Sequence, residues 1–179
     1  MLDQDIYKFK IVLIGNGGVG KTSLIRRFTQ DTFQKQYIKT IGAQFSIDQR
    51  QIENDQVSLI LWDIAGQDKF NFMRALFYKD TKAAVIVYSL EMNKMGKKSL
   101  EDVKTWYEDL TKHCGKIPIA VFANKVDIAY ENVVDIDKIK EIIGNNESLG
   151  YFVTSAKTGQ GVNLAFESLY EQMYYKFRY

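Results

Sequence analysis

The chain has 179 residues, of which 46% are hydrophobic and 26% are charged. This length and apolar content suit one globular domain with a full core, and they exclude a disordered chain. The 24 Lys and Arg residues nearly balance the 22 Asp and Glu residues, which leaves a formal net charge of +2. This balance argues against a nucleic-acid partner, because binding the negatively charged phosphate backbone requires a strongly basic surface.

No segment has the composition of a membrane span or of a signal peptide. The longest apolar runs, such as Ala83–Tyr88, have the length of strands, whereas a bilayer core needs about 20 residues. The start of the chain, Met1–Asp5, lacks both a basic and an apolar region. The single cysteine, Cys114, excludes an internal disulfide and fits a reducing compartment. We therefore expect a cytoplasmic protein.

Short apolar runs rich in β-branched residues alternate with amphipathic stretches along the chain. The runs have the length of buried strands, and the stretches place apolar residues at helical spacing. Asn54 and Asp55 are a turn signal between two strands, which predicts a hairpin. In chain order we predict strand 9–14, helix 21–29, strands 45–51 and 57–64, a helix, strand 83–90, helix 99–112, strand 117–123, helix 136–143, strand 151–154 and helix 161–176.

Finer features of these elements also follow from the pattern. Phe45 and Ile47 alternate with polar residues, which predicts that both face inward. Residues 91–98 contain Met and Lys without a clear period and are predicted to form a loop. Gly144 is expected to end the helix before it. The last helix is predicted to turn these residues toward the core: Val162, Leu164, Ala165, Phe166, Leu169 and Met173.

The alternation of strands and helices predicts an α/β fold. Sequential βα units build a mostly parallel sheet, here of six strands, with helices on both faces in a three-layer α/β/α arrangement. No linker or repeat interrupts the chain, so residues 1–179 are expected to form one domain. In such sheets ligands bind at the carboxyl ends of the strands. The functional residues should therefore lie in the loops that follow strands.

A glycine-rich segment, Gly15–Thr22, follows the first predicted strand and matches G-x-x-x-x-G-K-[ST]. Glycines let backbone N–H groups point at phosphates, and a helix N-terminus adds positive potential. Lys21 is expected to reach the β- and γ-phosphates, and Thr22 to coordinate Mg²⁺. The alternatives are a turn that only packs a helix on a strand, or the phosphate loop of a kinase or ATPase. The predicted phosphate-binding residues are Asn16, Gly17, Gly18, Val19, Gly20, Lys21, Thr22 and Ser23.

The strand at 57–64 contains an acidic residue close to its end, opposite the phosphate loop. Asp63 is in the position expected for a ligand of Mg²⁺. Gly66 allows its backbone N–H to approach the γ-phosphate closely, and Gln67 is suited to orient an attacking water. The alternative for Gln67 is a solvated polar side chain in a loop.

Two later segments predict a site for the guanine base. The Asp127 carboxylate can accept hydrogen bonds from the guanine N1 and exocyclic amine, a donor pair that adenine lacks. Lys125 can cover the base plane with its aliphatic stem, and Asn124 can brace the neighbouring loops. In the segment Ser155, Ala156, Lys157, the N–H of Ala156 can bond the guanine O6. The alternative for Asn124 and Asp127 is an ordinary loop and helix cap.

Together the motifs GNGGVGKT, DIAGQ, NKVD and SAK resemble, in order and spacing, those of Ras-superfamily small GTPases, which are P-loop NTPases. The resemblance covers residues 8–176. Within that superfamily the chain is most similar to Rab proteins, on the segments TIGAQF at 40–45, LWDIAGQDKF at 61–70 and FYK at 77–79.

The resemblance implies roles for further residues. Thr40 would bind Mg²⁺ in the GTP state, Phe33 would lie against the guanine, and Tyr37 would close over the phosphates. Segments 31–42 and 65–78 would be the two switch loops that effector, exchange and GTPase-activating proteins contact. Three aromatic residues would also contact effector proteins: Phe45, Trp62 and Phe77. The alternative is that these residues pack in the core.

The implied function is a monomeric switch that binds GTP or GDP with Mg²⁺ and slowly hydrolyses GTP, Rab-like in membrane trafficking or signalling. Gly17 leaves room beside Gln67, and Arg26 and Arg27 are expected to be surface or packing residues rather than catalytic ones. A GTP-binding scaffold with negligible hydrolysis is the alternative, because Ile64 stands where the family usually has Thr. The chain ends without a cysteine to prenylate, so the cytosolic face of a membrane is expected as a partner only if a lipidated tail is missing here.

Overall fold

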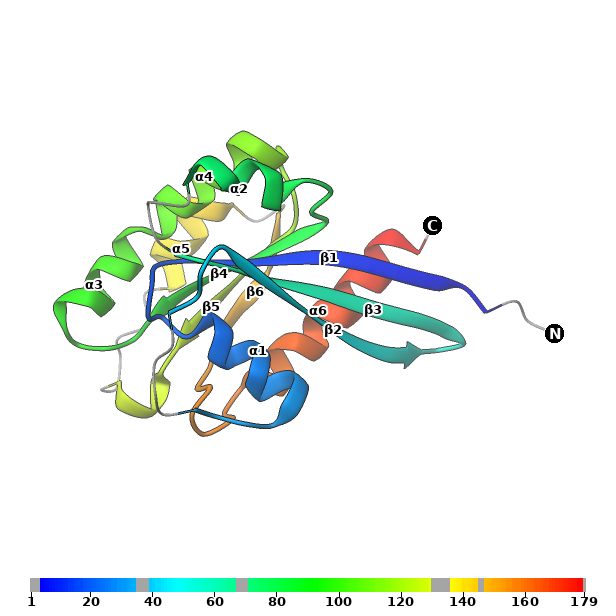
Figure 1. Cartoon of the computed structure of the whole chain (residues 1–179), viewed down its shortest axis with the longest axis horizontal. Coiled ribbons are helices and arrows are strands. Elements are labelled where there is room, and N and C mark those ends of the chain that lie inside the picture. Colours follow the sequence, from blue (N-terminus) through cyan, green and yellow to red (C-terminus); the bar gives the residue numbers. More distant parts are fainter. Residues whose placement is uncertain (1–3, 35–38, 67–70, 130–135, 145–146, 179) are drawn as a thin grey trace.

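A six-stranded sheet runs through the centre of the structure, which is a computed structural model (Figure 1). The structure describes residues 4–34, 39–66, 71–129, 136–144 and 147–178, apart from the side chains of 71 and 72. The strand order is β2-β3-β1-β4-β5-β6; β2 and β3 are antiparallel and the other neighbours are parallel. The elements are β1 (Ile6–Ile14), α1 (Lys21–Gln30), β2 (Ala43–Ile52), β3 (Asp55–Ile64), α2 (Asn71–Tyr78), β4 (Ala83–Ser89), α3 (Lys94–Glu101), α4 (Val103–Cys114), β5 (Ile119–Asn124), a 3₁₀ turn (Val126–Ile128), α5 (Ile136–Ile143), β6 (Ser148–Val153) and α6 (Val162–Phe177).

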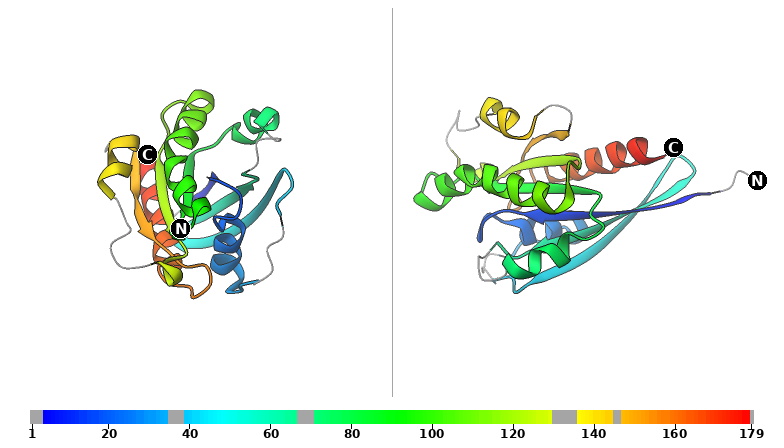
Figure 2. Two further views of the ribbon diagram at one scale, coloured as in Figure 1. Left: turned by 90° about the vertical axis from the view of Figure 1, so that its left-hand side faces the viewer. Right: turned by 90° about the horizontal axis from the view of Figure 1, so that it is seen from above.

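Helices cover both faces of the sheet, which confirms the predicted three-layer α/β/α arrangement (Figure 2). On one face α1 and α6 pack over Ile11 and Leu13 of β1. On the other face α2, α4 and α5 pack over Val12 and Ile14 of the same strand. Residues 11–14 of β1 are buried on both faces, and they form a continuous apolar run, whereas the first half of the strand includes Lys8 and Lys10. Among the described residues, no helix has both the length and the apolarity needed to cross a bilayer.

The inward orientation predicted for Phe45 and Ile47 is wrong. Phe45 is 61% exposed and Ile47 is 57% exposed, because both lie on the outer face of the edge strand β2. The inner face of β2 carries polar residues that find partners there. Asp48 accepts a hydrogen bond from Tyr170 of α6, and the Arg50 guanidinium lies 4.8 Å from the ring centre of Phe28. Paired in this way, polar groups can occupy the covered face of a strand.

The single helix predicted over 99–112, and the loop predicted before it, are also wrong in part. The chain already forms α3 from Lys94, and a break at Asp102 separates α3 from α4. Asn93 caps α3 by accepting a hydrogen bond from the Gly96 N–H, 2.8 Å long. In α6, Leu164 is 67% exposed instead of buried, whereas the other residues predicted for the core lie there. The helix end at Gly144 is confirmed: α5 ends at Ile143.

The C-terminal helix α6 runs beside the β2–β3 hairpin (Figure 2). Hydrogen bonds between side chains join the two elements. Tyr170 donates to Asp48 at 2.8 Å, and Tyr174 donates to Asp55 at 2.7 Å. Both tyrosines are buried. Burial and the neighbouring Asp48 carboxylate raise the pKa of Tyr170, so its hydroxyl remains a donor.

Tyr170→Phe is expected to lower the free energy of unfolding by about 2 kcal/mol, because it removes a buried hydrogen bond to a charged acceptor. Tyr175→Phe is the matched control: Tyr175 is 52% exposed, and its bond to Glu53 is 3.2 Å long. Urea denaturation of the two variants measures the difference. Equal unfolding midpoints for both variants and wild type would contradict a stabilising role for the Tyr170 hydroxyl.

Candidate functional site

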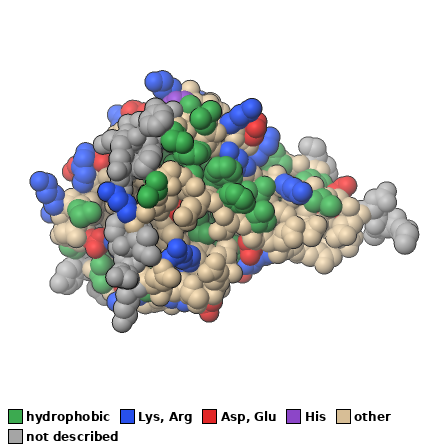
Figure 3. Space-filling model, viewed as in Figure 1, with side chains coloured by type: hydrophobic (Ala, Val, Ile, Leu, Met, Phe, Trp, Pro, Cys, Tyr) green, Lys and Arg blue, Asp and Glu red, His purple; other side chains and the backbone are tan. Residues whose placement is uncertain are grey.

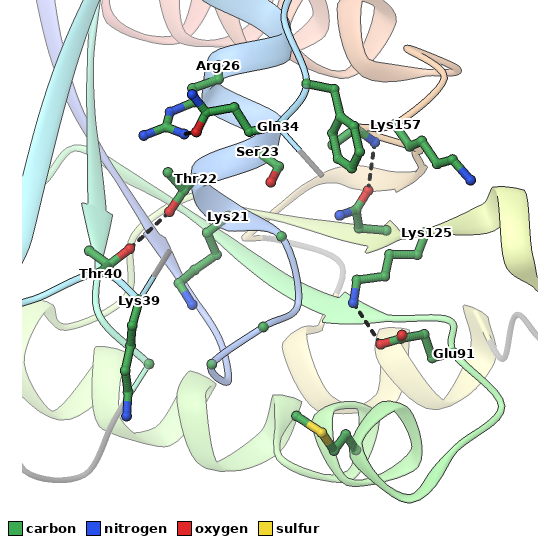
Figure 4. A pocket seen from close by; sticks show the side chains of 18 of the residues that line it. Lys21, Thr22, Ser23, Arg26, Gln34, Lys39, Thr40, Glu91, Lys125 and Lys157 are labelled. Carbon is green, nitrogen blue, oxygen red and sulfur yellow. Dashed lines mark hydrogen bonds and ion pairs between the residues drawn. The ribbon is translucent and has the colours of Figure 1, made fainter. Parts of the chain in front are cut away.

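A pocket of about 760 Å³ opens at the carboxyl ends of the parallel strands (Figure 4). It brings together most of the residues that the motifs single out. Four predicted residues do not line it: Asn16, Val19, Asp63 and Ser155. Tyr37 and Gln67 lie outside the described residues. The predicted residues that line the pocket are Gly17, Gly18, Gly20, Lys21, Thr22, Ser23, Phe33, Thr40, Gly66, Asn124, Lys125, Asp127, Ala156 and Lys157.

The phosphate-loop segment wraps around the Lys21 side chain. The ammonium is buried and donates to the carbonyl oxygens of Gly15 and Asn16, at 2.8 and 3.0 Å. Burial lowers the pKa of Lys21 to about 8, against the opposing influence of Asp63. Helix α1 begins at Lys21 without a side-chain cap, so its first N–H groups are not satisfied by a capping side chain. This end of the pocket therefore offers several donors and a positive potential to an anion.

Three oxygen-bearing side chains meet beside the phosphate loop, as Figure 4 shows in part. Thr22 donates to Asp63, and the Thr22 and Thr40 hydroxyl oxygens are 3.0 Å apart. The other carboxylate oxygen of Asp63, Oδ1, is buried and has no hydrogen-bond partner within the described part of the chain. Two hydroxyls and one carboxylate are hard oxygen ligands of the kind Mg²⁺ binds together with substrate phosphates. The residues present therefore fit a magnesium ion.

Gly66 lies against the phosphate loop at the end of the β3 segment. A Cβ atom on Gly66 would be 2.6 Å from both the Asn16 carbonyl carbon and the Gly17 nitrogen. No side chain fits at that distance, so glycine is required for this close approach. The approach places the beginning of the segment 65–78 beside the anion-binding end of the pocket.

The opposite end of the pocket is built around Asn124 and Asp127. Asn124 donates to the Val19 carbonyl oxygen at 2.9 Å and accepts from the Ala156 N–H at 3.1 Å, so it joins the loops as predicted. Asp127 accepts a hydrogen bond from the Ser155 hydroxyl at 2.6 Å. The Asp127 side chain is only 12% exposed. A partly buried carboxylate at this position can recognise a ligand that presents paired N–H donors.

Arg27 has a positioning role that the sequence interpretation missed. Its Nε donates to the Ala156 carbonyl oxygen and its Nη2 to that of Lys157, both at 2.8 Å. Arg27 thereby holds the loop after β6 against α1. Its position in the amphipathic pattern of α1 gives no sign of these partners, because they lie at the other end of the chain.

Comparisons with known proteins agree with this geometry. The model of the Ras family matches residues 10–175. The chain belongs to the Ras family. It is 35% identical to Ras-related protein Rab-21 of Bos taurus over 170 residues, which are 93% of this chain and 73% of that protein. It is 34% identical to Ras-related protein Rab-1 of Theileria parva (91% and 73% covered) and 33% identical to GTP-binding protein YPT1 of Saccharomyces cerevisiae (93% and 79% covered). The protein is thus a Rab-like small GTPase.

On the surface of this GTPase the three aromatic residues form a row in which Phe45 stacks on Trp62 and Phe77 is tilted against it. The ring centres of Phe45 and Trp62 are 5.6 Å apart, and those of Trp62 and Phe77 are 6.3 Å apart. Lys10 lies 4.3 Å from the Trp62 ring centre. Hydrophobic side chains gather over this face of the molecule (Figure 3), and Leu76 of α2 is 71% exposed. The row is therefore not a buried core cluster, although Trp62 and Phe77 also touch the core.

The GTPase has further pocket residues that no motif predicted. Glu91, Asn93 and Met95 line the pocket from the segment between β4 and the first turn of α3. The Glu91 carboxylate is 2.7 Å from the Lys125 ammonium, and Figure 4 shows this pair at one side of the pocket. Burial opposes the charge of Glu91, but hydrogen bonds from Lys125 and Ser89 outweigh it and lower the Glu91 pKa. In the sequence, residues 91–98 show only Met and Lys without a clear period, which predicts a loop and no pocket residue.

Proposed function

We propose that this small GTPase is a guanine-nucleotide-dependent switch that binds GTP or GDP with Mg²⁺ and slowly hydrolyses GTP. The observation that carries the proposal is one pocket with two chemically different ends. One end holds the buried Lys21 ammonium at the uncapped N-terminus of α1, and the other holds the Asp127 carboxylate, whose side chain is 12% exposed. Their arrangement suits a triphosphate joined to a purine with N–H donors.

At the base end, Asp127 accepts the N–H groups of guanine N1 and the exocyclic amine. The Lys125 stem covers one face of the base, and Phe33 lies at its edge. The Ala156 N–H donates to the Asn124 side chain in this structure; with guanine bound it would share that hydrogen with the guanine O6, a position where adenine presents an amine instead. Ser155, Lys157 and Asn124 hold these groups in place. Adenine would present no pair of N–H donors to the partly buried carboxylate, which is the source of the selectivity.

At the phosphate end, Lys21 and the N–H groups of Asn16 to Ser23 stabilise the negative charge of the transferred phosphoryl group. Thr22, Thr40 and Asp63 would hold Mg²⁺, which neutralises phosphate charge when bound. Gln67 orients the attacking water, and Gly17 leaves space beside it. No arginine is assigned to the reaction, so turnover in the absence of a partner is slow, as it is for Ras.

The two switch segments show partner proteins whether GTP or GDP is bound. Thr40 and Gly66 hold segments 31–42 and 65–78 against the γ-phosphate, and loss of that group releases them. Effector, exchange and GTPase-activating proteins bind there, with the exposed row Phe45, Trp62 and Phe77 as a further contact. We propose that residues 1–179 act as a single, monomeric G domain in Rab-like trafficking or signalling at the cytosolic face of a membrane.

Gln67→Leu tests whether the protein hydrolyses GTP or only binds it. In single turnover, the variant is expected to release phosphate at least about tenfold more slowly than wild type, because the attacking water is no longer oriented. Gln51→Leu, an exposed position on the distal half of β2, is the control and keeps the wild-type rate. Equal rates for wild type and Gln67→Leu would remove Gln67 from the mechanism. No phosphate release by the wild type would favour a GTP-binding scaffold.

A further inference from the structure

The segment between β4 and α3 contributes a wall to the pocket from outside the nucleotide-binding motifs. We call Glu91, Asn93 and Met95 the α3 wall, because all of them line the pocket and lead into or belong to the first turn of α3. Glu91 touches Lys125 from the base end, as described above. The wall raises the question of what it covers when the pocket is filled.

The two ends of the α3 wall mark its position along the pocket. The Met95 methyl carbon lies 3.8 Å from the position that a Cβ on Gly18 would take, so it rests against the phosphate loop. At the other end Glu91 meets Lys125, whose stem lies in the base end of the pocket. The wall therefore spans the interval between the phosphate end and the base end. In a nucleotide that interval is occupied by the sugar and the first phosphate.

Local contacts hold the α3 wall in place before any ligand binds. The Ser99 hydroxyl accepts from the Ser89 N–H at 2.9 Å and donates to the Gly96 carbonyl oxygen at 2.7 Å, which ties α3 to the end of β4. A Cβ on Gly96 would overlap the Glu91 carbonyl oxygen, so glycine permits the turn to close on itself. Together with the Asn93 cap, these contacts make the wall a preformed surface.

Met95 is the apolar side chain of the α3 wall, and protein atoms leave most of it uncovered. It is 65% exposed although it lines a pocket. A ligand that covers this apolar side chain removes it from water, which stabilises the complex. Met92 provides a comparison within the same segment. It is 49% exposed, but it lines the neighbouring groove beside α4 and not the nucleotide pocket.

We infer that the α3 wall, through Met95, covers the sugar and first phosphate of the bound guanine nucleotide and thereby slows its release. The inference rests on the proposed function, since it assigns a further binding residue to the same pocket. The first turn of α3 would then contact the nucleotide, although it belongs neither to the phosphate loop nor to the loops at the base end of the pocket.

Methionine oxidation tests the contact directly. The protein is treated with hydrogen peroxide, either stripped of nucleotide or loaded with GDP and Mg²⁺, and the sulfoxide at each Met is followed by peptide mass spectrometry. We expect GDP to slow oxidation of Met95 about fivefold or more and to leave Met92 unchanged. If chromatography finds one GDP per chain and Met95 is nevertheless oxidised equally in both forms, the contact between Met95 and the nucleotide is overturned and the proposed function is not. Protein that retains no GDP overturns the proposed function as well.

Release kinetics test the consequence. Met95→Ala is expected to release GDP about fivefold faster than wild type, whereas Met95→Leu, which keeps most of the apolar surface, stays near the wild-type rate. Met92→Ala is the control for the loss of an exposed methionine from this segment, and it releases GDP at the wild-type rate. The protein is loaded with radiolabelled GDP, and the rate at which the label is released is measured after unlabelled GTP is added in excess. Release from Met95→Ala at the wild-type rate, or equal acceleration in Met92→Ala, would contradict the inference.

Discussion

Asp127→Asn is expected to transfer the nucleotide preference of this GTPase from guanosine to xanthosine nucleotides. An amide at this position presents one acceptor and one donor in place of two acceptors. It leaves a guanine N–H unpaired in a buried site, and it matches the carbonyl that xanthine carries instead of the amine. We expect the affinity for GDP to fall about 10³-fold or more, because a buried polar group that loses its partner discriminates strongly.

The structure makes this substitution a clean test of the proposed base site. The Asp127 Oδ1 accepts from the Ser155 hydroxyl at 2.6 Å, and an amide oxygen can accept the same bond. The local fold should therefore persist. Competition between GDP and XDP at equilibrium measures the exchange of preference. Asp137→Asn, an exposed carboxylate in the first turn of α5, is the matched control and keeps the wild-type preference. An unchanged affinity of Asp127→Asn for GDP would refute the base-site assignment.

The location of the site could be predicted because its residues follow strands that are recognisable from local sequence. Leu13 pairs with Asp63 across β1 and β3, so the phosphate loop and the acidic residue meet at one edge of the sheet. Ser89 pairs with Asn124 across β4 and β5, which brings the base-end loop to the same edge. Parallel strands bring their carboxyl ends together, and spacing along the chain is then enough to place the motifs in one pocket.

The orientation of β2 could not be predicted, because alternation defines two faces without saying which is covered. Phe45 and Ile47 are the more apolar set, yet they face outward. The covered set is polar and is stabilised by partners more than a hundred residues away, Tyr170 and Glu167 of α6. Arg27 escaped prediction for the same reason, since its acceptors lie 129 and 130 residues further along the chain.

The first turn of α3 shows a different limit of sequence reasoning. Residues 94–98 contain one large apolar side chain, Met95, and Gly96 disfavours a helix. The helix forms there because Gly96 packs on the Glu91 carbonyl group and Ser99 bonds the end of β4. These tertiary contacts outweigh the local preference. They also place Met95 beside the phosphate loop, which no motif describes.

Gly66→Ala is expected to separate the binding of GTP from that of GDP. The added methyl group would overlap the Gly15 carbonyl oxygen and lie 2.6 Å from the Gly17 nitrogen. These are backbone atoms, which cannot turn aside as a side chain would, so the segment that begins at Gly66 must move away from the phosphate loop. The proposed hydrogen bond from the Gly66 N–H to the γ-phosphate is then lost, whereas GDP has no group at that position.

We expect the affinity of Gly66→Ala for GTPγS to fall at least about tenfold, since a hydrogen bond to a charged acceptor is lost. The affinity for GDP should stay close to wild type. Competition against one fluorescent nucleotide measures both. Gly115→Ala is the control: it also alters a glycine, at a positive φ of 67°, but in open space after α4 and outside the pocket. It is expected to lower stability without changing the ratio of the two affinities. An equal loss for GDP and GTPγS in Gly66→Ala would mean that the substitution disturbs the phosphate loop itself, and the γ-phosphate role of Gly66 would have to be abandoned.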